Sequence, residues 1–324
     1  MRIKHVENEE LSMRIYHACR EAGFDDCGII GLEDMPGFVA SAKERIRNVP
    51  ASEGLYGLAI NHTERLRETF PWAKSIVIAS TWLGKYRFPE ALRGRYSKGF
   101  FVSRNSDKSG PEYREKCKIG RWFDENHIRW TGEIREGGQQ IWGLRHAAAV
   151  AGLGIIRRNN FLYCEEGSWL ELDSYLIDRH CRLYQEKQIK PCPEKCTACR
   201  GACPTGALCG ANTLNPNHCV SLITTFGRGM IPEGLEEQQL GQWIAGCEAC
   251  QDACPFNRRH DWNSGKEFPG LDALVPRMSP ENIASTEDED FLRHLCDLTC
   301  DHILPDQTET LRVNARRALS NSAR

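Results

Sequence analysis

Residues 192–204 read CPEKCTACRGACP, and residues 247–255 read CEACQDACP. The first stretch has the spacing Cys-x3-Cys-x2-Cys-x3-Cys-Pro, and the second has Cys-x2-Cys-x3-Cys-Pro. Cys219 lies between them. Nine of the sixteen cysteines fall within residues 192–254, so this part of the chain needs a chemical explanation before any other.

These spacings are typical of ligands to two [4Fe–4S] clusters. A two-residue spacer lets a tight turn present adjacent thiolates to one cluster, while the cysteine before proline reaches the other. The cysteines then divide into two sets of four ligands: Cys192, Cys196, Cys199 and Cys254 for one cluster, and Cys203, Cys219, Cys247 and Cys250 for the other. The three-residue first spacer makes Cys192 the least regular ligand.

Structural zinc is the alternative, because paired Cys-x2-Cys units also form sites of four cysteines. Zinc does not need the Cys-Pro ending, which occurs here twice with exchanged partners. The pattern therefore favours iron–sulfur clusters, and with them an oxygen-sensitive protein that transfers electrons.

The composition predicts a cytoplasmic protein without membrane association. Hydrophobic residues make up 40% of the 324 and charged residues 27%, as in ordinary globular chains. The first residues show no signal-peptide pattern, and sixteen cysteines in such a chain argue against a disulfide framework. No run approaches the ~20 apolar residues of a membrane span. The formal net charge of -2 gives no global attraction to nucleic acid.

Hydrophobic periodicity outlines the rest of the chain. It predicts helices over 9–22, 112–126 and 139–151, and strands over 75–80 and 168–178, with a shorter apolar run at 27–30. The Gly-, Ser- and charge-rich stretch 94–111 is expected to be a long functional loop. We expect three parts: an α/β domain over 1–182, a cluster-binding module over 183–260 and a helical tail over 261–324.

Several longer segments resemble one known family. CTACRGACPTGAL (196–208), HCVSLITTFGRGMIPEGL (218–235) and GCEACQDACPFNRR (246–259) resemble the ferredoxin-like module of epoxyqueuosine reductases. The corrinoid-binding half of that family resembles AGFDDCGI (22–29), RYSKG (95–99), AGLGIIRRN (151–159) and GSWLELDSYLID (167–178). LRVNARRALSNSA (311–323) resembles the segment that follows the clusters there. The resemblance spans nearly the whole chain.

The resemblance implies an α+β fold: a nitroreductase-like, corrinoid-binding domain followed by a ferredoxin-like module with two [4Fe–4S] clusters. That family, like the related reductive dehalogenases, binds cobalamin in its base-off form. Residues at the matching positions would contact the corrinoid: Arg95, Tyr96, Leu153, Gly154, Arg157, Arg158, Ser221 and Thr224. Gly152 and Gly154 would let the backbone approach a flat macrocycle. The alternative for this AGLG segment is a helix C-cap followed by a turn.

Three departures from the family pattern affect the function. RYSKG continues as FFVS where the family has R-D-Y-H, and the family's acidic proton donor falls at Gly138. The helical repeat that helps the family grip tRNA would start near Leu311, and this chain ends at Arg324. On these grounds tRNA is not expected as a partner. Glu133 and Glu136 are the nearby carboxylates that could replace the acid; the alternative is that both are solvent-exposed loop charges.

Two functions remain open. The first is an oxidoreductase that passes electrons through two [4Fe–4S] clusters to a corrinoid, which then reduces a small substrate. The second is a corrinoid reductase, an electron-transfer protein whose substrate is free cobalamin or a partner corrinoid protein. A cluster protein with an emptied cofactor site is a third possibility. In the first two, a low-potential donor of the ferredoxin or flavodoxin type would supply the electrons.

Overall fold

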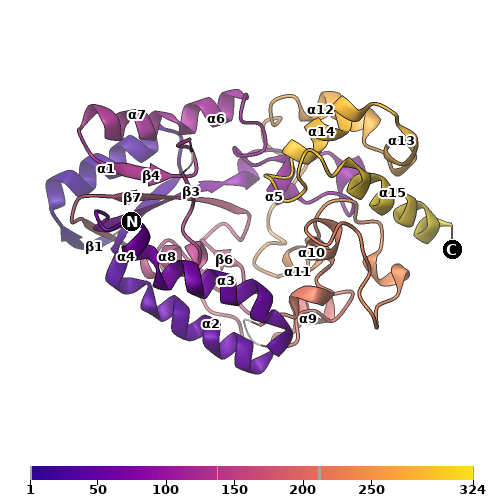
Figure 1. Cartoon of the computed structure of the whole chain (residues 1–324), viewed down its shortest axis with the longest axis horizontal. Coiled ribbons are helices and arrows are strands. Elements are labelled where there is room, and N and C mark those ends of the chain that lie inside the picture. The colour runs from indigo at the N-terminus through magenta and orange to yellow at the C-terminus, as the bar shows by residue number, and fades with distance from the viewer. Residues whose placement is uncertain (1, 137, 211–212, 324) are drawn as a thin grey trace. The chain divides into compact units, whose positions relative to one another are not determined.

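The computed structural model describes residues 2–136, 138–210 and 213–323 (Figure 1). The chain separates into two compact units, one formed by Met1–Trp82 and Arg114–Glu194, the other by Leu83–Tyr113 and Lys195–Arg324. This division differs from the three parts expected from the sequence, because segment 83–113 belongs with the C-terminal half and no boundary falls at 260/261. The hydrogen bond from Ser97 N to Ala245 O, 2.9 Å long, shows why: the segment pairs with a distant stretch, and local sequence patterns do not report such pairing.

None of the described helices is long and apolar enough to span a membrane.

The first unit is built on an antiparallel sheet with the strand order β1-β8-β2-β3-β7-β4. Its strands are β1 (Arg2–Glu7), β2 (Asp26–Gly31), β3 (Ser75–Trp82), β4 (Trp130–Gly132), β7 (Leu170–Ile177) and β8 (Arg182–Glu186). A small hairpin joins β5 (Ile155–Ile156) to β6 (Leu162–Tyr163). The strands predicted at 75–80 and 168–178 are confirmed as β3 and β7, which pair with each other along their whole length.

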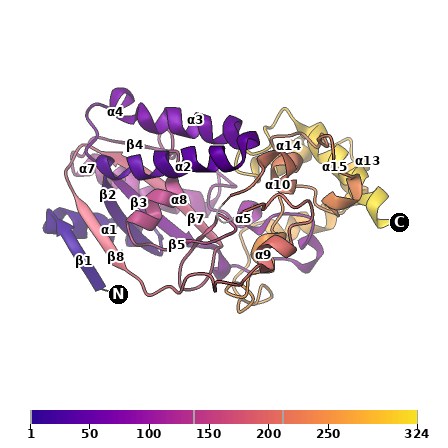
Figure 2. The ribbon, with the colours of Figure 1, turned by 90° about the horizontal axis from the view of Figure 1, so that it is seen from below.

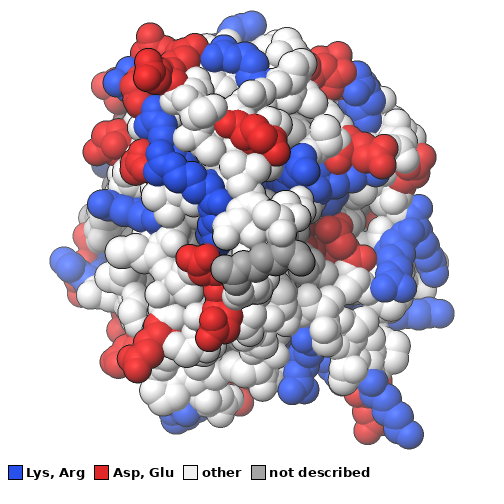
Figure 3. Space-filling view, turned by 90° about the vertical axis from the view of Figure 1, so that its right-hand side faces the viewer, with Lys and Arg blue, Asp and Glu red and all other residues white. Residues whose placement is uncertain are grey.

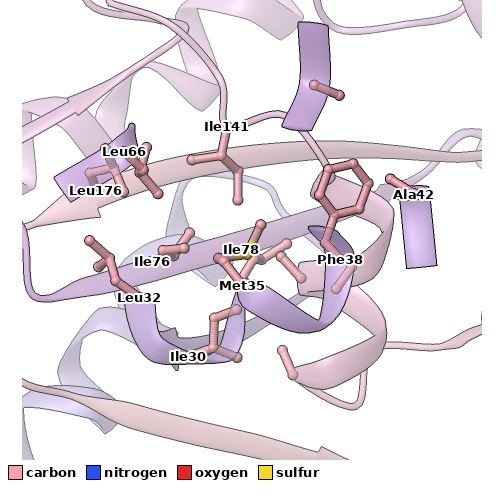
Figure 4. Close-up of a cluster of buried hydrophobic side chains, with 14 of the residues drawn as sticks. Ile30, Leu32, Met35, Phe38, Ala42, Leu66, Ile76, Ile78, Ile141 and Leu176 are labelled. Carbon is pink, nitrogen blue, oxygen red and sulfur yellow. The ribbon is translucent and has the colours of Figure 1, made fainter. Parts of the chain in front are cut away.

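Both faces of this sheet are covered by helices. On β3, Ile76 and Ile78 face one hydrophobic cluster while Val77 and Ala79 face another, as the two-residue period of a strand requires. The first cluster includes side chains of α2 (Pro36–Asn48), α3 (Glu53–Glu64) and α8 (Leu144–Val150). Figure 2 shows these helices, and Figure 4 shows part of the cluster, with Phe38 and Ala42 of α2 among its labelled side chains. The second includes side chains of α1 (Glu9–Glu21) and α7 (Lys118–Glu125).

Helix limits agree with the sequence only in part. The helix predicted over 9–22 is confirmed as α1. The one predicted over 112–126 divides into α6 (Pro111–Lys116) and α7. The one predicted over 139–151 is reduced to α8, because Ile141 N donates to Ser174 Oγ (3.1 Å) and ties the preceding loop to β7. A further short helix, α4 (Leu66–Thr69), follows α3.

The second unit consists mainly of short helices joined by loops. Its helices are α5 (Lys98–Phe101), α9 (Ala198–Gly201), α10 (Val220–Thr224), α11 (Ala249–Asp252), α12 (Leu271–Leu274), α13 (Pro280–Ser285), α14 (Glu289–Asp297) and α15 (Thr308–Ser322). Short 3-10 helices occur in this unit at Leu83–Lys85, Glu90–Leu92, Pro216–His218, Glu237–Leu240 and Val275–Arg277, and in the first unit at Leu32–Asp34 and Pro50–Ser52. A small core of Val220, Ile223, Leu240 and Trp243 packs beside α10.

Candidate functional site

The two cysteine motifs have the same backbone conformation. The residue before each short helix has φ and ψ of -125° and 11° at Thr197, and of -126° and 12° at Glu248. In each motif the last cysteine donates its amide three residues back: Cys203 to Arg200 O at 3.2 Å, and Cys254 to Gln251 O at 3.1 Å. The sequence repeat is therefore also a structural repeat, as the exchange of ligands between two clusters requires.

The ligand set assigned to the second cluster gathers within the second unit. Burial raises the pKa of Cys250, and the neighbouring thiols of Cys247, Cys219 and Cys203 raise it further. Burial also raises the pKa of Cys247, again with Cys219 and Cys203 adding to the effect. Four thiols that oppose one another's ionisation become thiolates only where a cation compensates them, and the iron of a cluster does so. This donor set fits a [4Fe–4S] cluster.

Backbone amides also point at these sulfurs. Ser221 and Leu222, at the start of α10, hydrogen-bond to Cys219, and Ala249 hydrogen-bonds to Cys247. Amide hydrogen bonds to cluster sulfurs are one means by which proteins tune the reduction potential. The short helices α10 and α11 thus supply electrostatic support as well as ligands.

The other assigned ligands are Cys192, Cys196, Cys199 and Cys254. Cys196, Cys199 and Cys254 belong to the second unit, and Cys192 lies near the end of the first. Arg157 holds the backbone beside Cys192: its Nη2 donates to Lys190 O, and its Nη1 lies 4.0 Å from Cys192 Sγ. Within the described residues, no three His, Cys, Asp or Glu side chains converge on a point suited to a single metal ion.

Sequence reasoning missed how α15 holds the cluster segments. Asn314 is fully buried and its Nδ2 donates to Thr224 O at 2.9 Å and to Ile244 O at 2.8 Å. Thr224 ends the helix after Cys219, and Ile244 precedes Cys247. Arg317 donates to Asn314 Oδ1 (2.8 Å) and keeps the amide oriented. The available signal was the NARRAL run within 311–323.

The residues matched to the corrinoid contacts lie in both units, and several serve the interior of their own unit. Tyr96 is fully buried and donates its hydroxyl to Met278 O at 2.8 Å. Thr224 is also fully buried; its hydroxyl donates to Val220 O and accepts from Gly246 N. Leu153 belongs to the hydrophobic cluster under α8. Arg157 stacks on Tyr163 at 4.9 Å.

The glycines of the AGLG segment make close contacts within the protein. Gly152 has φ +79° and terminates α8, and a Cβ there would lie 1.9 Å from Gln185 O. A Cβ on Gly154 would lie 2.5 Å from Tyr163 O. Both glycines are therefore required by the C-cap and turn. Arg95, Arg158 and Ser221 are the half-buried members of the corrinoid set.

The loop after β4 explains the missing acid. Gly138 N donates to Arg135 O at 2.8 Å, and a Cβ at position 138 would lie 2.0 Å from Gly132 O. This position therefore accepts only glycine. Of the two alternative carboxylates, Glu136 is exposed, whereas Glu133 is half-buried and accepts a hydrogen bond from Gln140 Nε2. Gln140 also donates to Leu172 O on β7 (3.0 Å).

Glu133 faces a buried cluster of charges that sequence reasoning missed. Lys116 and Asp173 are fully buried; Lys116 Nζ lies 2.5 Å from Asp173 Oδ1 and 3.8 Å from Glu171 Oε1. Burial alone would lower the pKa of Lys116, but Asp173, Glu171 and Glu133 outweigh it and raise the pKa. The signal was the acidic alternation in the ELD run at 171–173, on a strand buried on both faces. The first unit thus holds a buried ammonium group within 4 Å of two buried carboxylates, and the charge of Glu133 also acts on it.

Comparison with known proteins resolves the choice between zinc and iron–sulfur. The model of a family described as a 4Fe-4S double cluster binding domain matches residues 192–257, a range that contains all eight assigned cysteines. The epoxyqueuosine reductase of Gloeobacter violaceus is 32% identical over 95% of this chain and 96% of its own length. The epoxyqueuosine reductase of Prochlorococcus marinus is 36% identical over 35% of this chain and 36% of its own length. That of Yersinia pestis is 36% identical over 46% of this chain and 36% of its own length.

Solved epoxyqueuosine reductases share the fold. The enzyme of Bacillus subtilis, captured with its catalytic aspartate loop swung out of the active site, matches 97% of this chain and 82% of its own with a TM-score of 0.71 and 20% identity. An epoxyqueuosine reductase with a tRNA-Tyr stem loop carrying epoxyqueuosine matches the same shares with a TM-score of 0.72 and 21% identity.

The expectation that tRNA is not a partner is wrong, because a reductase of this fold has been solved with a tRNA stem loop. Net charge misled the prediction, since RNA contacts depend on local groups of basic side chains rather than on the total. Figure 3 shows Lys and Arg in several such groups, with Asp and Glu between them.

The comparisons confirm the expected cofactors, two [4Fe–4S] clusters and cobalamin, because the family that matches end to end binds both. They also confirm the expectation of an oxidoreductase family. The chain belongs to the epoxyqueuosine reductase family.

Proposed function

We propose that this protein reduces epoxyqueuosine in tRNA to queuosine, with a ferredoxin- or flavodoxin-type protein as electron donor. The observation that carries the proposal is the 32% identity with an epoxyqueuosine reductase over 95% of this chain and 96% of that protein. A tRNA nucleoside therefore replaces the small substrate expected from the sequence. Such a reaction would take place in the cytoplasm, which is also the location that the sequence composition predicts.

Removal of an epoxide oxygen consumes two electrons and two protons, leaving an alkene and releasing water. The clusters and cobalamin, when bound, supply the low-potential electrons. The protein must supply a proton to the departing oxygen, and a positioned acid contributes roughly 10²–10⁴-fold to such a step.

We propose Glu133 as that acid. A solved relative carries its catalytic aspartate on a loop, and in this chain a side chain at the matching position 138 would collide with Gly132 O. Glu133 is the first carboxylate after β4, and Gln140 fixes its orientation. Its connection to Lys116, Asp173 and Glu171 supports a role in which buried charges hold and resupply a proton.

The first unit is proposed to be the nitroreductase-like, corrinoid-binding domain. In this unit, Arg158 is half-buried and carries donors suited to the amide groups at the rim of a corrin. Arg95 and Ser221, the other half-buried members of the corrinoid set, belong to the second unit. Substituting Gly154 would not test this role, because even a Cβ there collides with Tyr163 O. Arg158→Ala is the better variant, since Arg158 is half-buried and its hydrogen bond to Glu194 O is exposed to solvent. The binding of cob(II)alamin by the Arg158→Ala variant is measured from the base-off EPR signal.

A second function, reduction of the corrinoid itself, is favoured by one observation: position 138 holds glycine instead of an acid. Both functions use the same clusters, but only the first needs Glu133.

One experiment separates the two functions. Anaerobic protein with reconstituted clusters, cobalamin and a chemical reductant is mixed with an epoxyqueuosine-containing tRNA stem loop, and the nucleosides are analysed by mass spectrometry. Formation of queuosine is expected. Reduction of cobalamin to its Co(I) absorption without queuosine would replace the first function with the second, and failure of both would reject the two together.

A further inference from the structure

Glu248 lies between two assigned ligands of one cluster, Cys247 and Cys250, and it is only 1% exposed. A buried carboxylate needs partners for both oxygens. Ser97 Oγ and Gly99 N each donate to Oε1 at 3.0 Å, and Lys98 Nζ donates to Oε2 at 2.7 Å. All these contacts come from one stretch, residues 97–99.

Lys98 is itself almost fully buried, with 4% of its side chain exposed. Besides Glu248, its ammonium group contacts Asp252 Oδ1 at 3.0 Å. It also lies over the rings of Trp262 and Phe88, at 5.3 and 6.0 Å from their centroids. Burial would lower the pKa of Lys98, but Glu248 and Asp252 outweigh it and raise the pKa, so the group carries a positive charge.

The backbone keeps this pair in register with the cluster loop. Segment 95–99 runs beside segment 244–248: Ile244 N donates to Arg95 O at 2.7 Å, and Ser97 N donates to Ala245 O at 2.9 Å. Gly246 has φ +84°, and a Cβ there would lie 2.5 Å from Ser97 Cβ. Lys98 and Glu248 therefore cannot shift independently of Cys247.

We propose that Lys98, acting through Glu248, sets the reduction potential of the cluster ligated by Cys203, Cys219, Cys247 and Cys250. Reduction adds one negative charge to the cluster, so a buried cation nearby favours the reduced state and a buried anion opposes it. Lys98 is a positioning and electrostatic residue, and it touches no substrate. This inference rests on the proposed ligand set and is independent of the substrate.

The test is an EPR-monitored redox titration of anaerobic protein. Lys98→Met should lower the midpoint potential of this cluster, and Glu248→Gln should raise it. For each, the ratio of oxidised to reduced cluster at a fixed potential should change about tenfold, or about 59 mV for a one-electron couple, as expected for a unit charge in a partly screened interior. The double variant should return toward the wild-type potential.

Lys108→Met is the matched control, because Lys108 pairs with Asp301 at 2.7 Å in the same unit but both side chains are about half exposed. Its midpoint should equal that of the wild type. Shifts of the same sign in both single variants, or no shift in either, would overturn the proposal. Iron content separates this failure from a failure of the ligand set: variants with full iron and unshifted potentials refute the role of Lys98, whereas wild-type protein without two clusters refutes the ligands.

Discussion

Position 138 shows that the reason for a single substitution can be invisible in a sequence comparison. A pattern match finds glycine in place of an acid and infers lost chemistry. The structure gives a steric reason for the glycine, because a Cβ would lie 2.0 Å from Gly132 O. Glu133 and Glu136 were indistinguishable in the sequence, since both are loop carboxylates. Only the fold separates them: Glu133 accepts a hydrogen bond from Gln140, and its charge helps to raise the pKa of the buried Lys116.

At this scale we predict that Glu133→Gln lowers the rate of queuosine formation by about 10²–10⁴-fold, because the amide cannot donate the proton that a carboxylic acid supplies. Single-turnover formation of queuosine on a tRNA stem loop is the measurement. Glu136→Gln, a change of the same chemistry on an exposed side chain of the same loop, should retain the wild-type rate. Cobalamin reduction should remain normal in both variants. Equal rates for wild type and Glu133→Gln would remove Glu133 from the mechanism.

The elements were predictable where the hydrophobic pattern was strong and local. Strand β3 was found from its run of β-branched residues and β7 from the alternation of its side chains. The limits of α8 were missed because hydrogen bonds to β7 hold residues 140 and 141 outside the helix. The role of α15 was also missed, since its main task is to join two loops that lie far from it in sequence.

Asn314 of α15 joins two segments of the cluster-bearing unit, and a substitution tests this role. Asn314→Ala should lower the free energy of unfolding of the cluster-bearing unit by roughly 2–4 kcal/mol, because two buried carbonyl oxygens, of Thr224 and Ile244, lose their donor. Anaerobic denaturant titration with release of iron as the readout measures the effect. Asn321→Ala is the control: Asn321 also donates to two carbonyl oxygens from the same helix, but it is only half-buried and one of the two bonds is exposed to water. Equal losses in the two variants would contradict the joining role of Asn314.

At the scale of the whole molecule, the cysteine chemistry was readable because ligands to a cluster must occupy fixed spacings, whatever the surrounding fold. The division into units was not readable, because segment 83–113 is separated by sequence from the unit to which it belongs. The same segment carries Lys98, which is why its ion pair with Glu248 could not be predicted. Net charge failed as a guide to tRNA for the corresponding reason: it sums over the chain and discards position.

Iron and sulfide analysis of the intact protein tests the assignment of the cluster ligands. Anaerobic wild-type protein should contain about eight iron and eight sulfide per chain, from two [4Fe–4S] clusters. Cys250→Ser should reduce both to about four and leave one cluster signal by EPR, because Cys250 is assigned with Cys203, Cys219 and Cys247 and only that cluster loses a ligand. Cys209→Ser is the control, since Cys209 lies between the motifs but is exposed and belongs to neither set. It should leave iron and sulfide unchanged. Retention of all eight iron in Cys250→Ser, or loss of iron in Cys209→Ser, would require a different assignment of ligands.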